Sequence, residues 1–140
     1  MLYAPQNKIL LPNNMQMKSI VRLRRVSENC LPDTIPLIIG TEPFIIGRHD
    51  NGVDQKLCDF EFRYNTIAVS RRHAAIERLI NGYAIVDLNS SAGTFINGNR
   101  IITGEQYLII QGDIVSFGNA GADYIFEEQN QGVCNDVDIQ

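Results

Sequence analysis

The chain contains a series of short runs in which apolar and polar residues alternate, with turn residues between the runs. In the run from residue 20 to residue 25, Val21 and Leu23 alternate with arginines, which is the period of two expected of a strand with one buried face. The pairs Asn81-Gly82 and Asn97-Gly98 each lie between two such runs, and Asn-Gly is a strong signal for a β-hairpin. The pattern predicts about eleven short strands and no amphipathic helix, which is typical of an all-β sandwich.

The length of the chain suits a single domain with short terminal extensions. A chain of 140 residues can bury a core without support from disulfides or metals. We expect a poorly ordered arm at residues 1–18, the folded domain at residues 19–127, and an acidic, polar tail at residues 128–140.

Charge is distributed unevenly along the chain. Residues 1–100 hold all twelve lysines and arginines and nine of the sixteen acids, whereas residues 101–140 hold seven acids and no base. The net charge of -4 gives no reason to expect a nucleic acid or an anionic membrane as partner. A site for an anion must therefore lie within residues 1–100.

Three cysteines stand far apart, at Cys30, Cys58 and Cys134, and the chain has two histidines. This pattern fits neither a disulfide framework nor a zinc site, and we expect no metal and no cofactor. Unpaired thiols suit a reducing compartment. Because the first residues also lack the charged and apolar regions of a secretory signal, we expect an intracellular, cytoplasmic protein without membrane insertion.

A cluster of hydrogen-bond donors precedes the apolar run that starts at Ala75. It comprises Ser70, Arg71, Arg72 and His73, and the pair Gly47-Arg48 ends an earlier run. Guanidinium and hydroxyl groups this close together suit an anion with several acceptor oxygens.

Four motifs in a fixed order resemble those of a known family. They are Gly47-Arg48, Ser70-Arg71-Arg72-His73, Gly93-Thr94-Phe95-Ile96-Asn97-Gly98, and the run from Gly112-Asp113 to Phe117-Gly118. The set is similar to that of forkhead-associated (FHA) domains, and the resemblance covers roughly residues 19–127. It implies an FHA-type β-sandwich (SMAD/FHA-like) that binds phosphothreonine in partner proteins through loops at one end, without catalysis.

The resemblance also implies roles for individual residues. Contacts with the phosphopeptide would come from Arg48, Ser70, Arg71 and Asn97, the first three with the phosphate and the last with the peptide backbone. The loops would be shaped and braced by Gly47, His73 and Gly98.

The chemistry of these side chains agrees with the implied ligand. A phosphate at neutral pH carries close to two negative charges, and each charge-assisted hydrogen bond contributes about 1.5–3 kcal/mol. The amide of Asn97 can both donate to and accept from a peptide backbone. A preference for threonine over serine would come from one methyl group in an apolar niche, worth roughly 1–3 kcal/mol.

Neighbouring arginines need different assignments. Successive side chains of an extended segment alternate between two faces, so Arg71 and Arg72 cannot both face a ligand. We assign Arg71 to the ligand and Arg72 to a surface ion pair. His73 is expected to be a buried, hydrogen-bonded scaffold residue and not a catalyst.

Two features depart from the family's usual pattern. Ala92 stands where the family often has asparagine, and residues 49–56 form a somewhat long loop. Both features bear on which peptide sequence is selected.

The main expectation is a non-catalytic adaptor that recruits a protein phosphorylated on threonine by a Ser/Thr kinase. One alternative is an FHA scaffold that assembles complexes without phosphate, through the strip of Arg22 and Arg24 or through the acidic tail. The remote alternative is a hydrolase that uses Cys58 with His49 or His73.

Overall fold

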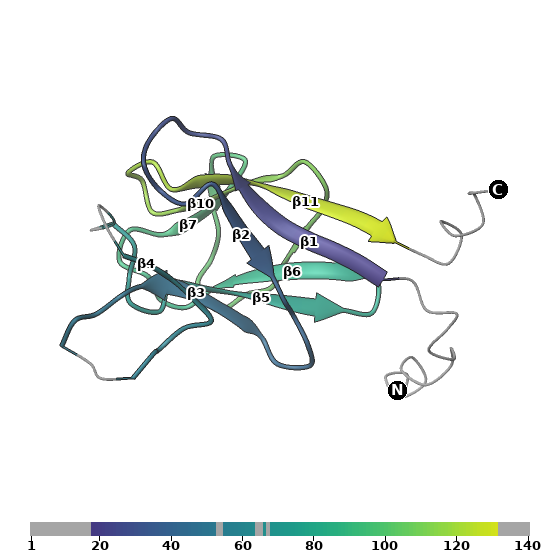
Figure 1. The fold of residues 1–140 in the computed structure, drawn as a ribbon, viewed down its shortest axis with the longest axis horizontal. Coiled ribbons are helices and arrows are strands. Elements are labelled where there is room, and N and C mark those ends of the chain that lie inside the picture. Colours follow the sequence, from purple (N-terminus) through teal and green to yellow (C-terminus); the bar gives the residue numbers. More distant parts are fainter. Residues whose placement is uncertain (1–17, 53–54, 64–65, 67, 132–140) are drawn as a thin grey trace.

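Two β-sheets lie face to face in the computed structural model of the chain, which describes residues 18–52, 55–63, 66 and 68–131 (Figure 1). The six-stranded sheet has the order β2 (Thr34–Leu37), β1 (Lys18–Arg25), β11 (Asp123–Gln131), β10 (Ile114–Phe117), β7 (Thr94–Ile96) and β8 (Asn99–Arg100). The five-stranded sheet has the order β4 (Phe60–Phe62), β3 (Phe44–Arg48), β5 (Ala74–Leu79), β6 (Gly82–Asp87) and β9 (Tyr107–Ile109). The predicted all-β sandwich of eleven strands is confirmed.

The described residues include no helix that is long and apolar enough to cross a membrane. Residues 1–17 of the expected arm and residues 132–140 of the expected tail lie outside the described residues.

Strand β1 shows how the alternating pattern becomes a buried face and an exposed face. Val21 and Leu23 are buried between the sheets, while Arg22 and Arg24 point outwards. Both arginines bind the carboxylate of Glu127 on β11, at 2.7 and 2.8 Å. The basic strip considered as an assembly surface is therefore largely engaged within the sheet.

Strand β11 is longer than the sequence suggested. It continues past Glu127 to Gln131, because β1 offers a partner along its whole length and Lys18 lies opposite Gln131. The sandwich therefore includes Lys18 of the expected arm and residues 128–131 of the expected tail.

Both predicted hairpins are present. Leu79 lies opposite Gly82, so the turn between β5 and β6 consists of Ile80 and Asn81, one residue earlier than the Asn-Gly pair. Asn97 and Gly98 form the turn between β7 and β8, with φ values of 51° and 85°. Positive φ at both central residues is the geometry that suits the twist of a two-residue hairpin, and it explains why Asn-Gly occurs there.

Aromatic rings join the two sheets. Phe62 of β4 packs against Phe117 of β10 and Tyr124 of β11, with ring centroids 6.1 and 6.0 Å apart. Tyr83 of β6 packs against Phe126 of β11 at 5.6 Å. Contacts of this kind add to the burial of apolar area and fix the sheets relative to each other.

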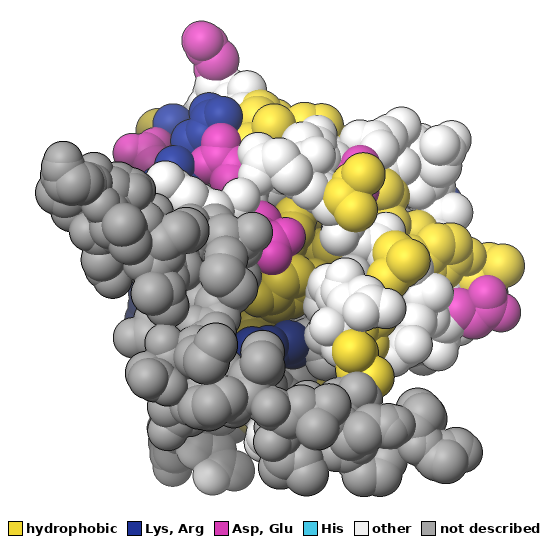
Figure 2. Space-filling view, turned by 90° about the vertical axis from the view of Figure 1, so that its right-hand side faces the viewer, with side chains coloured by type: hydrophobic (Ala, Val, Ile, Leu, Met, Phe, Trp, Pro, Cys, Tyr) yellow, Lys and Arg dark blue, Asp and Glu magenta, His cyan; other side chains and the backbone are white. Residues whose placement is uncertain are grey.

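The two ends of the sandwich differ in character. β1 begins and β11 ends at one end, on the right in Figure 1, together with the β5–β6 turn. This end has hydrophobic side chains at its surface (Figure 2), and Ile80 in the turn is 62% exposed. The loop after β3 and the start of β5 lie at the other end, which carries the candidate site.

Candidate functional site

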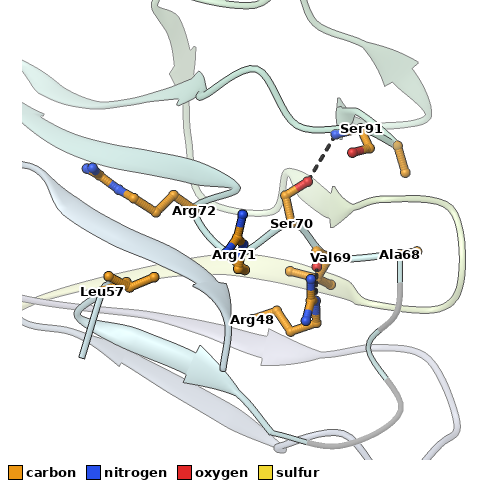
Figure 3. A pocket seen from close by; sticks show the side chains of 9 residues that line it. Arg48, Leu57, Ala68, Val69, Ser70, Arg71, Arg72 and Ser91 are labelled. Atoms are coloured by element: carbon orange, nitrogen blue, oxygen red, sulfur yellow. Dashed lines mark hydrogen bonds between the residues drawn. The ribbon is translucent and has the colours of Figure 1, made fainter. Parts of the chain in front are cut away.

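A pocket of about 650 Å³ lies where β3 ends and β5 begins (Figure 3). Its lining comprises Arg48, Leu57, Ala68, Val69, Ser70, Arg71, Arg72, Ser91 and Ala92. Of the four expected ligand contacts, the fold therefore brings three together, namely Arg48, Ser70 and Arg71. Asn97 is not among the residues that line the pocket.

Arg48 is held in place by the segment that carries Ser70. The backbone N–H of Arg48 donates to the carbonyl of Ser70 at 2.9 Å, and its Nε donates to the carbonyl of Val69 at 2.8 Å. The side chain is half-buried, and its Nη groups make no hydrogen bond to any residue that the structure describes. A guanidinium anchored through Nε keeps its two outer nitrogens for an anion in the pocket.

Ser70 is oriented by the loop that follows β6. Its Oγ accepts a hydrogen bond from the backbone N–H of Ser91 at 3.0 Å (Figure 3). Because that bond uses an oxygen lone pair, the hydroxyl proton remains available to donate to an acceptor in the pocket.

The two arginines after Ser70 differ from the assignment made from alternation. Arg71 forms an ion pair with Asp50 at 2.9 Å, whereas Arg72 makes no ion pair within the described part of the chain. The prediction that Arg72 forms a surface ion pair is therefore wrong, because Arg71 forms that pair. Residues 71 and 72 lie in a bend and not in an extended strand, so the alternation rule does not apply to them.

Asp50 keeps its charge beside Arg71. A hydrogen bond from the Gly52 N–H and another from Arg71 lower the pKa of Asp50 below its usual value. An anion in the pocket must therefore compete with a carboxylate for Arg71.

Gly47 allows the two loops to meet. A Cβ atom at this position would lie 2.0 Å from the carbonyl oxygen of Arg71 and 2.8 Å from the Sγ of Cys58. The position thus accepts only a residue without a side chain, and the backbone of Arg71 packs directly on β3.

His73 connects the segment before β5 with the loop after β6 from a fully buried position. Its Nδ1 accepts from the backbone N–H of Ser70 at 3.0 Å, so its proton lies on Nε2, which donates to the carbonyl of Gly93 at 2.8 Å. Burial lowers the pKa of His73, although the carbonyl of Gly93 acts in the opposite direction. The ring is therefore a neutral brace, as a scaffold role requires.

We expect the stability of the domain to fall as the pH drops through the range from 7 to about 5. The pKa of folded His73 lies below that of the unfolded chain, so the unfolded state takes up a proton first and is favoured as the pH falls. Thermal midpoints of the wild type at pH 7.5, 6.5 and 5.5 would show the slope. The change of the thermal midpoint with pH should be smaller in His73→Gln than in the wild type. The same measurement on His49→Gln shows how much of the change comes from the other histidine. An equal slope in wild type and His73→Gln would contradict the assignment.

Asn97 has a different place from the one expected. Its side-chain Nδ2 donates to Asp113 at 3.0 Å, and its Oδ1 accepts from the backbone N–H of Ile114 at 2.8 Å. The amide thus ties the β7–β8 turn to the start of β10, and Gly98 completes that turn. The contact of Asn97 with a peptide stays a prediction.

A buried carboxylate holds the loop that carries Ser91 and Ala92, and the sequence did not point to it. Asp87 is 2% exposed and accepts hydrogen bonds from the hydroxyls of Ser90, Thr94 and Thr103. Burial alone raises the pKa of Asp87, but these bonds outweigh it and lower the pKa below its usual value. The donors are spread over residues 90–103, and no local spacing rule identifies them in advance.

Cys58 has the properties of a structural thiol. It is 6% exposed, and its Sγ donates to the carbonyl of Arg71 at 2.9 Å. Burial, with a further contribution from Glu61, raises the pKa of Cys58 to about 11. A thiol that stays protonated at neutral pH is a poor nucleophile, which argues against the hydrolase alternative.

Several known proteins are similar to this chain. The mouse (Mus musculus) Smad nuclear-interacting protein 1 is 29% identical over 89 residues, which are 59% of this chain and 23% of that protein, so the chain spans about a quarter of this relative. A solved structure from a study of phosphothreonine-dependent FHA domain interactions is 26% identical, with a TM-score of 0.57, over 77% of this chain and 95% of that chain. The yeast splicing factor Pml1 shares the fold at 16% identity, with a TM-score of 0.64, over 89% of this chain and 88% of that chain.

The sequence profile of the FHA domain matches residues 44–118, a span that runs from β3 to the end of β10 and includes every residue lining the pocket. FHA domains are non-catalytic modules that bind phosphothreonine in protein–protein interactions. Since the match covers more than half of the 140 residues, the chain belongs to the FHA domain family.

Proposed function

We propose that this chain binds proteins phosphorylated on threonine, and that the phosphate enters the pocket formed by Arg48, Ser70 and Arg71. One observation carries the proposal. The guanidinium groups of Arg48 and Arg71 and the hydroxyl of Ser70 line one pocket, and the Nη groups of Arg48 have no hydrogen-bond partner within the described residues. This set matches a group with two negative charges and several acceptor oxygens.

A bound phosphate would displace the carboxylate of Asp50 from the guanidinium of Arg71. That ion pair is exposed on the Arg71 side, and an exposed pair contributes little to stability. A phosphate that carries more charge than a carboxylate therefore outcompetes Asp50 at small cost. The ligand implies a Ser/Thr kinase upstream, and the module would act as an adaptor in that kinase's signalling.

Ala92 reduces the contacts that the pocket offers to the peptide. It lines the pocket but has no group that donates or accepts a hydrogen bond beyond its backbone. The amide of Asn97 bonds Asp113 and Ile114, so it does not supply the side-chain donor and acceptor that Ala92 lacks. The phosphate would accordingly supply most of the affinity, and matched phosphorylated and unphosphorylated peptides should differ strongly.

The proposal is tested by titrating a library of phosphothreonine peptides against the wild type, with phosphoserine and unphosphorylated versions of each peptide. We expect binding of phosphothreonine peptides alone. Arg48→Ala should weaken it by at least about a hundredfold, since two charge-assisted bonds are lost. The thermal midpoint should hardly change, because Arg48 contributes one hydrogen bond through Nε to the fold.

Two controls make the result specific. Arg78→Ala removes an exposed arginine of β5 that does not line the pocket, and it should leave the affinity unchanged. Ser70→Ala should weaken binding while the protein stays folded. Equal binding before and after phosphatase treatment of a partner would refute the proposal and would favour assembly without phosphate.

A further inference from the structure

An apolar surface lies exposed where β5, β6 and β9 come together, at the end of the sandwich that Figure 2 shows. Its members are Leu79 and Ile80 at the β5–β6 turn, Leu108 in β9 and Ile110 directly after β9, which we call the apolar end patch. Ile80, Leu108 and Ile110 are 62%, 68% and 66% exposed. The described residues therefore leave most of this patch uncovered.

The strand register places three of these side chains on one face of the sheet. Ile109 is 2% exposed and belongs to the core, so Leu108 and Ile110, on either side of it, point to the outer face. β9 pairs with β6 as far as Ile109, so Ile110 follows beside Gly82, and Leu79 lies opposite Gly82 on β5. A Cβ atom at Gly82 would meet no atom within 4 Å. The patch therefore has an open space over Gly82 that can receive a side chain from another segment.

The charges beside the patch are acidic. Glu77 lies two residues before Leu79 and so shares the outer face of β5 with it. Its carboxylate accepts a hydrogen bond from Gln106 at 2.5 Å and forms no ion pair with a described residue. Glu105 is exposed just before β9. A segment that combines aliphatic residues with a positive charge would complement this surface.

The sequence of residues 1–17, which lie outside the described residues, has this composition. It contains the aliphatic run Ile9-Leu10-Leu11, preceded by Lys8, and no aspartate or glutamate. β1 begins at Lys18, at the same end of the sandwich as the β5–β6 turn (Figure 1). An extended chain from Leu11 to Lys18 can span about 23 Å. The length of this segment and the place where it joins the fold therefore let the aliphatic run reach the patch.

We propose that Ile9-Leu10-Leu11 packs on the apolar end patch of the same chain, with Lys8 near the acids beside it. The contact removes aliphatic side chains of both partners from water. Composition alone predicts a poorly ordered arm, and the patch gives this part of the arm a surface to bind. Tethering favours this occupant over a second copy of the chain, because a short linker keeps the segment at an effective concentration in the roughly millimolar range.

Tryptophan fluorescence tests the contact, because the chain contains no tryptophan of its own. Leu108→Trp should emit at short wavelength and be quenched weakly by acrylamide, since the N-terminal segment shields the indole from water. Leu10→Asp, added to this variant, places a charge in the contact and should shift the emission to longer wavelength and strengthen the quenching. Ile110→Trp is the second reporter should Leu108→Trp fail to fold.

Two controls make the fluorescence change specific. Asn13→Asp adds the same charge outside the aliphatic run and should leave the emission of Leu108→Trp unchanged. Ile38→Trp reports on a position directly after β2 that is 84% exposed, and its emission should not respond to Leu10→Asp.

Three results would overturn the inference. The first is strong quenching of both reporters while the N-terminal segment is intact. The second is shielding that survives Leu10→Asp, since another segment would then cover the patch. The third is shielding that weakens on dilution of the protein, which would identify a second copy as the occupant. Each result leaves the proposed phosphate site unaffected, because none of the four patch residues lines that pocket.

Discussion

Asp87→Ala should lower the free energy of unfolding by about 3–5 kcal/mol, because several buried donors lose their acceptor together. Thr94 is fully buried and Ser90 is 7% exposed, and the hydroxyls of both donate to Asp87. Each buried donor left without a partner costs about 1–3 kcal/mol. For a domain of this size, the thermal midpoint should fall by roughly 10–20 °C.

Asp33→Ala is the matched control for Asp87→Ala. The carboxylate of Asp33 binds Arg25 at 2.8 Å, but its side chain is 83% exposed. Removing an exposed ion pair should change the free energy of unfolding by about 1 kcal/mol or less. The free energy of unfolding of Asp87→Asn should lie between those of wild type and Asp87→Ala, since the asparagine amide keeps one acceptor oxygen. A change in Asp87→Ala no larger than that in Asp33→Ala would refute the role of Asp87.

Gly47→Ala should abolish phosphopeptide binding and reduce stability by about 3 kcal/mol or more. The new methyl group would meet the carbonyl oxygen of Arg71 at 2.0 Å, and a backbone atom cannot rotate away as a side chain does. The bend that carries Ser70 and Arg71 must then shift from β3. Denaturant unfolding and peptide titration of the same preparation would measure both effects.

Gly40→Ala provides the comparison for Gly47→Ala. A Cβ atom at Gly40 would meet no atom within 4 Å, so the substitution should change neither stability nor affinity appreciably. Wild-type binding by Gly47→Ala would show that the contact between β3 and the bend is not needed for the site.

The sandwich was predictable because its signals are local. Alternation in β1 identified Val21 and Leu23 as buried, and Asn97-Gly98 identified a hairpin. Other features depend on residues far apart in the chain. The parallel pairing of β3 with β4 and the extension of β11 to Gln131 follow from the partners that each strand meets, which no local pattern records.

The structure places the expected site residues in different surroundings, for equally specific reasons. Arg48, Ser70 and Arg71 were placed together by motif, and the fold brings them to one pocket. Asn97 does not line the pocket, and the sequence could not show this, because an Asn-Gly turn has the same sequence whether its amide faces a ligand or, as here, Asp113. The bond from Ser91 to Ser70 joins two loops, so spacing along the chain could not reveal it.

The pairing of Lys18 with Gln131 has a practical consequence. Both ends of the folded part leave from neighbouring positions, at the opposite end of the sandwich from the loop after β3 (Figure 1), and that loop begins at Arg48, which lines the pocket. A dye, an affinity tag or a sensor surface coupled at either end would therefore leave the pocket facing solvent. Forces applied through the two ends would pull β1 and β11 apart first, one hydrogen-bonded pair after another, before they reach the loops around Arg48.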